Sequence, residues 1–403
     1  MEIRPCADVA ELRRAMVVWH YFGGEPSLED MERFASFHPP DRMFGAWEGA
    51  TCVGGAGGFP FRCSLPHGRD VASSGVTAVG VAPTHRRQGV LTALMRAQLD
   101  DLHARGEPVA WLWASESTIY GRFGYGLASL AAEIAVPRER TRFALDLPSP
   151  FRARLVSHEE ALAAFPVVYD AVYRQRPGMT SRSTAWWANR RLHDNPARRG
   201  GAGVLNRALF EDHDGRPVGY ALYRVRQQLE RHVSVGAAVV VEVMGVSPEA
   251  TRAAWRFALD LDWVARIEAS LLPVDHPLTL LVAEPRRLAM SLADGVWVRL
   301  VDVGAALSAR GYAPHDPVVF EVDDPFCRWN TGRWRLADGV AARTDASPDL
   351  RLGVDALGSV YLGGFSLRRL AEAGRVEEVR PGAIALADRA FAADAQPWCP
   401  EVF

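Results

Sequence analysis

The sequence predicts a multidomain protein of the α/β (α+β) class, and three observations support this prediction. Apolar strand-like segments and amphipathic helix-like segments alternate through the first 145 residues, as expected for strands covered by helices. A strand–turn–helix pattern near residue 80 recurs near residue 245. From about residue 285 short strands and helices follow in a different order, and 403 residues are enough for two or three separate cores.

The first region is expected to contain, in order, a helix at 8–19, two strands within 41–63, a strand at 73–83, a helix at 89–104, a strand at 109–115 and a short helix within 116–126. The helix at 89–104 has apolar residues at helical spacing, among them Val90, Leu94 and Leu102. Two prolines in DLPSPF, residues 146–151, predict a linker after this region.

After the linker, the sequence predicts a helix at 157–174 and strands within 204–225 and 234–246. Here Gly245-Val246-Ser247-Pro248 repeats the order of Gly80-Val81-Ala82-Pro83, each with a strand before it and a helix after it. The repeat indicates either a duplicated lobe or a chance match of two short segments. A duplicated lobe would have lost its basic turn, because Ala254 stands at the position of Gly89 and the paired arginines are missing.

The last region is expected to form a separate α+β domain, with strands at 317–322, 333–336 and 351–354 and helices near 303–311 and 366–374. It ends in PWCPEVF, which is apolar and rich in proline. Most chain ends fray and are polar, so this one is expected to be docked against the protein.

Composition excludes several classes of function. The formal charge is −2, all 46 basic residues are arginine, and no long basic run is present, so a nucleic acid partner is not expected. No apolar run approaches the roughly 18 residues of a membrane helix, and the acidic N-terminal segment is unlike a signal peptide, so we expect a cytoplasmic protein. The five cysteines lack a CxxC pair and the histidines lack ligand spacing, so no metal site is predicted.

The turn in VAPTHRRQGVLTALM, residues 81–95, is the strongest candidate for a binding site. Free backbone N–H groups at a helix N-terminus attract anions, Gly89 allows close approach, and Arg86 and Arg87 add charge and forked donors. The GxGxxG and GxxxxGKS/T patterns of nucleotide-binding loops are both absent. A basic turn at a helix start can also be solvated surface.

This turn resembles the pyrophosphate-binding motif of the GCN5-related N-acetyltransferases, Arg/Gln-x-x-Gly-x-Gly/Ala, and departs from it at Leu91. Further segments resemble the Eis-type N-acetyltransferases of that superfamily and occur in the same order. They are ASESTIYGRFGYG, RPGMTSRSTAWW, WRFALDLDWVARIEA, LAMSLADGVWVRLVDV and the apolar end at Phe403. The resemblance spans most of the chain.

The resemblance implies two tandem GCN5-related acetyltransferase-like lobes, at 1–147 and 148–285, the second of them degenerate, and a sterol-carrier-protein-like domain at 286–403. It also implies direct transfer of an acetyl group from acetyl-CoA to an amine, notably of an aminoglycoside, in a ternary complex. It further implies assembly as a homohexamer. Another amine, such as a polyamine, an arylalkylamine or a protein lysine, is the alternative within this chemistry. A non-catalytic acyl-CoA- or lipid-binding protein is the alternative from another class.

Site residues follow from the same motifs. Tyr120 corresponds to the general acid, since a phenol with a pKa near 10 can donate a proton to a departing thiolate. The terminal carboxylate, here that of Phe403, corresponds to the base. Residues that correspond to the cofactor site are Val79, Gly80, Val81, Arg87, Gln88, Gly89, Val90, Leu91, Thr92, Ser115 and Glu116.

A polycationic substrate should meet carboxylates and aromatic faces. Glu401, beside the terminus, is the first candidate to bind such a substrate. Glu25 in WHYFGGEP is the second, together with Trp19 and Phe22.

Overall fold

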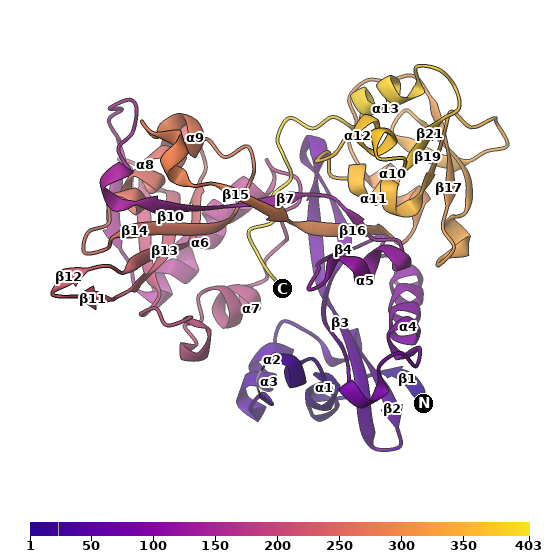
Figure 1. Ribbon diagram of the computed structural model, residues 1–403, viewed down its shortest axis with the longest axis horizontal. Coiled ribbons are helices and arrows are strands. Elements are labelled where there is room, and N and C mark those ends of the chain that lie inside the picture. The colour runs from indigo at the N-terminus through magenta and orange to yellow at the C-terminus, as the bar shows by residue number, and fades with distance from the viewer. Residues whose placement is uncertain (23) are drawn as a thin grey trace. The chain divides into compact units, whose positions relative to one another are not determined.

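The structure is a computed structural model that describes residues 1–22 and 24–403, and the side chains of Phe22 and Arg198 lie outside the description (Figure 1). The chain divides into two compact units. Unit 1 contains residues 1–129, 295–397 and 402–403, and unit 2 contains residues 130–294 and 398–401.

The first sheet of unit 1 has seven strands. Their order is β1 (Glu2–Pro5), β2 (Met43–Glu48), β3 (Thr51–Leu65), β4 (Arg69–Val81), β5 (Val109–Trp113), β16 (Val296–Leu300) and β6 (Gly126–Leu127). Neighbouring strands are antiparallel except β4 and β5, which are parallel. The helices of this part are α1 (Val9–Ala15), α2 (Trp19–Phe22), α3 (Leu28–Ala35), α4 (Val90–Ala104) and α5 (Ser117–Tyr120).

Helix α4 forms because its apolar residues recur on one face, and Val90, Leu94, Met95, Leu99 and Leu102 of that face are buried. Burial of each of these side chains stabilises the fold by roughly 1.5–3 kcal/mol relative to its exposure to water. This packing fixes the N-terminal end of α4 relative to the strand β4 that precedes it.

The second sheet of unit 1 has five strands, and helices from the same part of the chain pack near it (Figure 1). The strand order is β19 (Val340–Arg343), β18 (Gly332–Ala337), β17 (Val318–Asp323), β20 (Leu350–Gly353) and β21 (Val376–Glu378). The helices are α10 (Val303–Ala309), α11 (Val354–Val360), α12 (Leu367–Glu372) and α13 (Ala383–Phe391).

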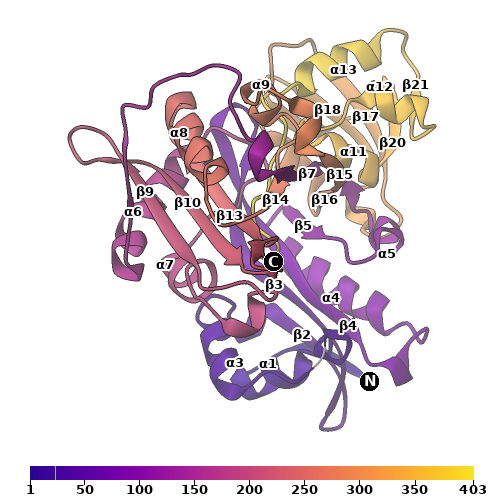
Figure 2. The ribbon, with the colours of Figure 1, turned by 60° about the vertical axis from the view of Figure 1, so that its left-hand side comes forward.

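Unit 2 contains a seven-stranded sheet. The strand order is β15 (Ser291–Asp294), β7 (Leu130–Pro137), β14 (Arg266–Leu272), β13 (Ala237–Gly245), β10 (Pro217–Arg226), β9 (Asn206–Glu211) and β8 (Arg152–Leu155). Among the described strands of this sheet, only the neighbours β13 and β14 are parallel. Figure 2 shows β9, β10 and β13 running side by side. The other elements are α6 (His158–Tyr173), α7 (Thr184–Trp186), α8 (Pro248–Leu259), α9 (Leu278–Leu281) and the ribbon of β11 (Leu229–Glu230) and β12 (Val233–Ser234).

The predicted α/β class is confirmed, and each helix and strand predicted from the sequence overlaps an observed one. Both copies of the repeat form a strand followed by a helix, β4 with α4 and β13 with α8.

Two strands lie in other sheets than their sequence position suggests. Strand β7 falls in the range 1–147 but pairs with β14 and β15 in unit 2, whereas β16 pairs with β5 and β6 in the first sheet. The physical reason is burial, since Val296, Val298 and Leu300 of β16 are fully buried where they complete the first sheet.

Candidate active site in the first lobe

The basic turn opens helix α4 with exposed backbone. Gly89 is the N-cap, with φ of 83°, and no side chain caps the helix there. A Cβ added at Gly89 would meet nothing within 4 Å, so the space in front of the turn is open. Arg87 also has a positive φ, of 61°, a conformation that L-residues rarely adopt. The first turn of α4 therefore offers N–H donors to a ligand, as an anion site requires.

The two arginines of the turn have different surroundings. Arg86 lies over the ring of Tyr21, at 4.8 Å from its centroid, and donates to the Tyr21 hydroxyl at 3.0 Å. That hydroxyl donates to the carbonyl of Val81 at 2.6 Å. Arg87 is exposed, and so is Gln88. Tyr21 thus holds Arg86 against the end of β4, while Arg87 points its charge to solvent.

Strands β4 and β5 part next to this turn. Their parallel pairing runs from Ser73 and Val109 to Gly75 and Trp111, whereas β4 continues to Val81. A bulge in the pairing with β3 places Ala78 at a φ of 52° just before Val79, Gly80 and Val81. A parallel pair that opens in this way offers a free strand edge to a ligand.

On β5 the chain continues into Ser115 and Glu116, both exposed, and then into the short helix that carries Tyr120. Tyr120 is 6% exposed. Burial raises the pKa of its phenol, and a hydrogen bond with Ser115 partly opposes that effect. Tyr120 is therefore protonated at neutral pH and able to donate.

Tyr125 is the neighbouring phenol, with its ring 5.9 Å from that of Tyr120. It is fully buried, its hydroxyl has no hydrogen-bond partner among the described residues, and burial raises its pKa strongly. Tyr125 is therefore a packing residue, and Tyr120 is the phenol with a polar neighbour at the end of β5.

Phe403 packs where β4 and β5 begin to part. Its ring lies 5.3 Å from that of Phe61 and 5.8 Å from that of Trp111. A Cβ added at Gly75 would lie 3.0 Å from the Phe403 ring. Gly75 and Trp111 form the last pair between the two parallel strands. The terminal residue is docked, as its apolar character predicts.

The residues expected to bind the amine have separate environments. Trp19, in α2, is half-buried, while Glu25 is exposed and forms an ion pair with Arg13 at 3.2 Å. The side chain of Phe22 lies outside the described residues.

Glu401, the first candidate to bind the amine, lies in a buried network of ion pairs and hydrogen bonds. Glu401 is 4% exposed, accepts a hydrogen bond from Trp186 Nε1 at 3.2 Å and forms an ion pair with Arg182 at 2.8 Å. A buried carboxylate neutralised in this way has no free charge for a cationic ligand.

His38 is a residue near this region that sequence reasoning missed. It is fully buried, stacks on Phe34 with ring centroids 4.8 Å apart, and contacts Phe59 at 5.1 Å. Neither ring nitrogen has a partner among the described residues, and burial lowers its pKa to about 4. A lone histidine between prolines and phenylalanines carries no sequence signal for this environment.

The residues that are present fit acetyl-CoA. An uncapped helix start with open space at Gly89 suits a diphosphate, and the free edge of β4 beyond Gly75 suits an amide-containing arm. Tyr120, a protonated phenol, lies in the short helix after β5, and the ring of Phe403 packs at the last pair of β4 and β5.

Family models match three parts of the chain. Two different models, each described as an acetyltransferase (GNAT) domain, match residues 2–128 and 178–300, and a sterol carrier protein domain matches residues 303–400. The fold is therefore that of two GNAT lobes followed by a sterol-carrier-like domain, and the internal repeat is a duplicated lobe.

Similar proteins define the family more closely. An uncharacterized N-acetyltransferase of Streptomyces avermitilis is 43% identical over 390 residues, 95% of this chain and 94% of the relative. N-acetyltransferase Eis of Mycobacterium tuberculosis is 36% identical over 367 residues, 87% of this chain and 85% of the relative. The crystal structure of Eis1 from Mycobacterium abscessus superposes with a TM-score of 0.85 at 35% identity, covering 100% of both chains.

The chain belongs to the Eis family of N-acetyltransferases, within the GNAT class. Acetyl-CoA is the co-substrate that this class implies. No helix among the described residues is long and apolar enough to cross a membrane.

Proposed function

We propose that the first lobe transfers the acetyl group of acetyl-CoA directly to an amine of an aminoglycoside-type polycationic substrate. The observation that carries the proposal is the docking of Phe403 against Gly75 and Trp111, the pair at which β4 and β5 part. The ring of Phe403 packs on the last pair of β4 and β5, and Tyr120, in the helix after β5, packs in one cluster with Val76 and Val79 of β4.

Acetyl-CoA supplies an activated thioester at this site. The N–H groups at the start of α4, with Arg87, Gln88, Gly89, Val90, Leu91 and Thr92, would hold its diphosphate. The edge formed by Val79, Gly80 and Val81 would pair with its pantetheine arm, and Ser115 and Glu116 would flank it. Arg86, held by Tyr21, would add a fixed positive charge.

The terminal carboxylate of Phe403 would accept one proton from the substrate ammonium group, which leaves a neutral amine. The amine nitrogen then forms a bond to the acetyl carbon as the carbon–sulfur bond breaks, and the second proton that this nitrogen loses replaces the one that Tyr120 gives up. Tyr120 would donate its proton to the departing sulfur, and its raised pKa keeps that proton in place until then. No covalent enzyme intermediate is required.

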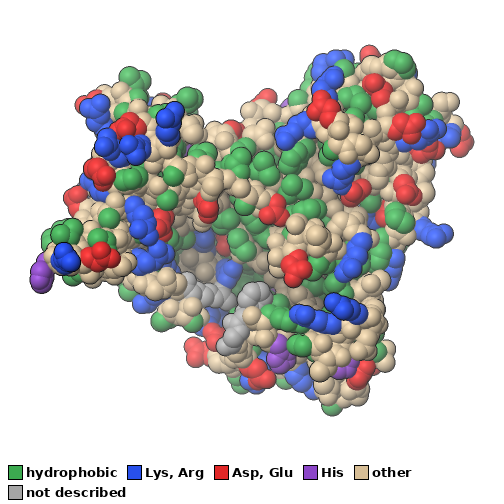
Figure 3. All heavy atoms as spheres, viewed as in Figure 1, with side chains coloured by type: hydrophobic (Ala, Val, Ile, Leu, Met, Phe, Trp, Pro, Cys, Tyr) green, Lys and Arg blue, Asp and Glu red, His purple; other side chains and the backbone are tan. Residues whose placement is uncertain are grey.

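The substrate is proposed to be cationic, with Glu25, Trp19 and Phe22 near the amine. On the face in Figure 3, arginines and acidic residues are interspersed, which does not suit a polyanionic partner such as nucleic acid.

A lipid ligand is the other alternative. The pocket along β17 and β18 is lined by charged residues, which do not suit a lipid chain; they are Glu321, Arg333, Arg343 and Asp345.

The test is release of the CoA thiol from acetyl-CoA by the wild-type protein with an aminoglycoside such as kanamycin, a polyamine, an arylalkylamine or a lysine peptide. We expect release with the aminoglycoside. If CoA is released only with another amine, the proposed acetyl transfer stands and the proposed substrate class is wrong. No release with any amine, despite measurable CoA binding, would contradict the proposal.

We further propose, from the resemblance to the family, that the protein is cytoplasmic and assembles as a homohexamer. Light scattering on the purified full-length protein tests the assembly, and a mass below that of six copies would contradict it.

A further inference from the structure

The second lobe contains the same strand opening as the first. Its parallel strands β13 and β14 pair from Ala237 and Arg266 to Val240 and Ala269. Strand β13 then continues to Gly245, while Leu271 of β14 adopts a φ of 56°. The second lobe therefore opens at the place where the first lobe is proposed to hold its cofactor.

The helix beside this opening has no free anion site. Helix α8 begins at Pro248, directly after the strand, and its N-cap Ser247 accepts from the Ala250 N–H at 3.2 Å. A Cβ added at Gly245 would lie 2.3 Å from the backbone nitrogen of Thr251, so the helix start is packed against the strand end. The lobe has kept its opening and lost the turn that would bind a phosphate.

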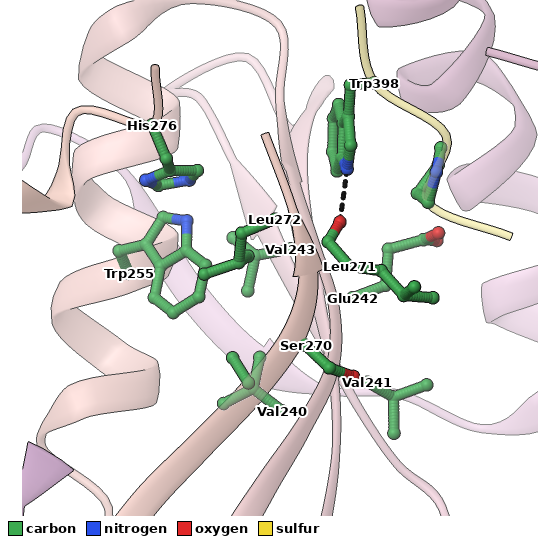
Figure 4. A pocket seen from close by; sticks show the side chains of 12 residues that line it. Val240, Val241, Glu242, Val243, Trp255, Ser270, Leu271, Leu272, His276 and Trp398 are labelled. Atoms are coloured by element: carbon green, nitrogen blue, oxygen red, sulfur yellow. Dashed lines mark hydrogen bonds between the residues drawn. The ribbon is translucent and has the colours of Figure 1, made fainter. Parts of the chain in front are cut away.

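The chain's own C-terminal tail fills this opening. Figure 4 shows the indole of Trp398 across the end of β14, where its Nε1 donates to the Leu271 carbonyl at 2.5 Å. The Trp398 N–H donates to the carbonyl of Pro177 at 2.8 Å. The remaining cavity, lined by β13, β14, Trp398 and Pro400, has a volume of about 10 Å³. That is room for about one water, so the tail takes the place of a ligand.

A buried charge network holds the end of this segment. Arg182, with a side chain 0% exposed, forms ion pairs with Glu401 at 2.8 Å and with Glu242 at 2.7 Å. Arg191 pairs with Glu242 at 2.6 Å, and the Tyr220 hydroxyl donates to Glu242 at 2.6 Å. Two arginines balance two glutamates, so each buried charge is compensated.

We propose that residues 398–401 are an internal ligand of the degenerate second lobe, and that Glu401 and Arg182 are positioning residues for the terminal carboxylate of Phe403. The second part rests on the proposed function, in which that carboxylate is the base. Only Val402 separates Glu401 from Phe403, so an anchored Glu401 confines the Cα of Phe403 to within about 7 Å of its own. A free chain end would lose this restraint.

The test compares Glu401→Gln with Glu159→Gln in the full-length protein. Glu159 is an exposed carboxylate in α6 of the same lobe and is the matched control. Release of Phe403 by carboxypeptidase, followed by mass spectrometry, measures the anchoring without any activity. Steady-state kinetics measure kcat and the KM for acetyl-CoA, and thermal unfolding shows whether each variant is folded.

We expect Glu401→Gln to release Phe403 at least about tenfold faster and to lower kcat at least about tenfold with an unchanged KM for acetyl-CoA, while Glu159→Gln changes neither. If Glu401→Gln does not fold, Trp398→Phe removes the hydrogen bond to Leu271 and should shift both measurements in the same direction by a smaller factor.

Release of Phe403 at the wild-type rate in both tail variants would overturn the proposal. Faster release with an unchanged kcat would overturn the positioning role and remove the carboxylate from the mechanism. If wild-type protein acetylates no amine but Glu401→Gln still speeds release, the proposed function fails and the internal ligand stands.

Discussion

The openings of the two parallel strand pairs show how one backbone arrangement serves two purposes. In the first lobe β4 and β5 part beside an uncapped helix start, with Gly89 facing open space. In the second lobe β13 and β14 part beside a helix capped by Ser247, and Trp398 fills the gap. Loss of cofactor binding in the second lobe therefore required no change of fold, only a shorter turn and an internal occupant.

The comparison also separates two kinds of polar chemistry. At its opening the first lobe keeps Arg86 and Arg87 at the surface, where they can meet a ligand. The second lobe buries Arg182 and Glu242 together. Burial alone would raise the pKa of Glu242, but the charges of Arg182 and Arg191 hold that pKa well below its usual range. The exposed arginines at the opening of the first lobe can bind a ligand, whereas the buried ion pairs of the second lobe hold the tail in place.

Extension of the chain beyond Phe403 should have the largest effect. Two added glycines would move the terminal carboxylate away from Phe403, whose ring packs at Gly75, so we expect kcat to fall about 10⁴-fold. Binding of acetyl-CoA, measured by calorimetry, should be unchanged, because the turn at α4 is untouched. An extended protein with normal turnover would show that the chain end serves structure alone.

Tyr120→Phe should lower kcat about 10³-fold, since it removes the proton donor and leaves the ring packing intact. Tyr125→Phe is the matched control, because it removes a neighbouring buried hydroxyl that has no hydrogen-bond partner in the described structure. CoA release in the presence of amine measures both variants. Equal activity of the two variants would remove Tyr120 from the mechanism.

Acidification should destabilise the first lobe through His38. Burial lowers the pKa of His38 to about 4 in the folded protein, whereas the pKa of a histidine in the unfolded chain is about 6.5. Between these two pH values the unfolded chain binds a proton that the folded chain does not. Stability should therefore fall by about 3 kcal/mol between pH 6.5 and pH 4. Urea unfolding midpoints measure this.

His38→Leu should remove this part of the pH dependence, whereas His213→Gln, which changes an exposed histidine, should retain it. The second lobe holds a counterpart in His276, whose burial lowers its pKa to about 3. An unchanged pH profile in His38→Leu would show that His38 remains accessible to protons in the folded state.

The smallest effect is expected at the helix start. Gly89→Ala should raise the KM for acetyl-CoA about tenfold, because alanine disfavours the positive φ and a Cβ would stand where a phosphate approaches. The counterpart in the second lobe is Ser247, the N-cap of α8, because the structure places Ala254 inside that helix. Ser247→Gly should leave this KM unchanged. A similar rise in both variants would mean that the second opening also contributes to cofactor binding.

Local features were predicted from sequence where local chemistry determines them. The helix over 90–104, the turn at Gly89 and the repeated strand–helix order follow from apolar spacing and glycine placement. The roles of Tyr120 and Phe403 came from motif resemblance and are proposals, whereas the structure places the Phe403 ring at the last pair of β4 and β5.

Features that depend on distant partners were not predictable. Nothing in residues 296–300 shows that β16 pairs with β5, since any exposed strand edge accepts an apolar strand. The buried surroundings of Glu401 could not be predicted for the same reason. Whether a glutamate binds a substrate or an internal arginine depends on which side chains meet it, and Arg182 lies far away in sequence.

The placement of β16 has a consequence for how the protein is made. The first sheet has β5 at an open edge until residues 296–300 have been synthesised, because β16 comes from beyond the whole second lobe. Nascent chains therefore carry an unpaired strand edge for much of translation, a state that favours aggregation and chaperone binding. For the same reason, a gene fragment that ends at residue 147 encodes an incomplete sheet, and the sheet is complete only when the chain extends to Leu300.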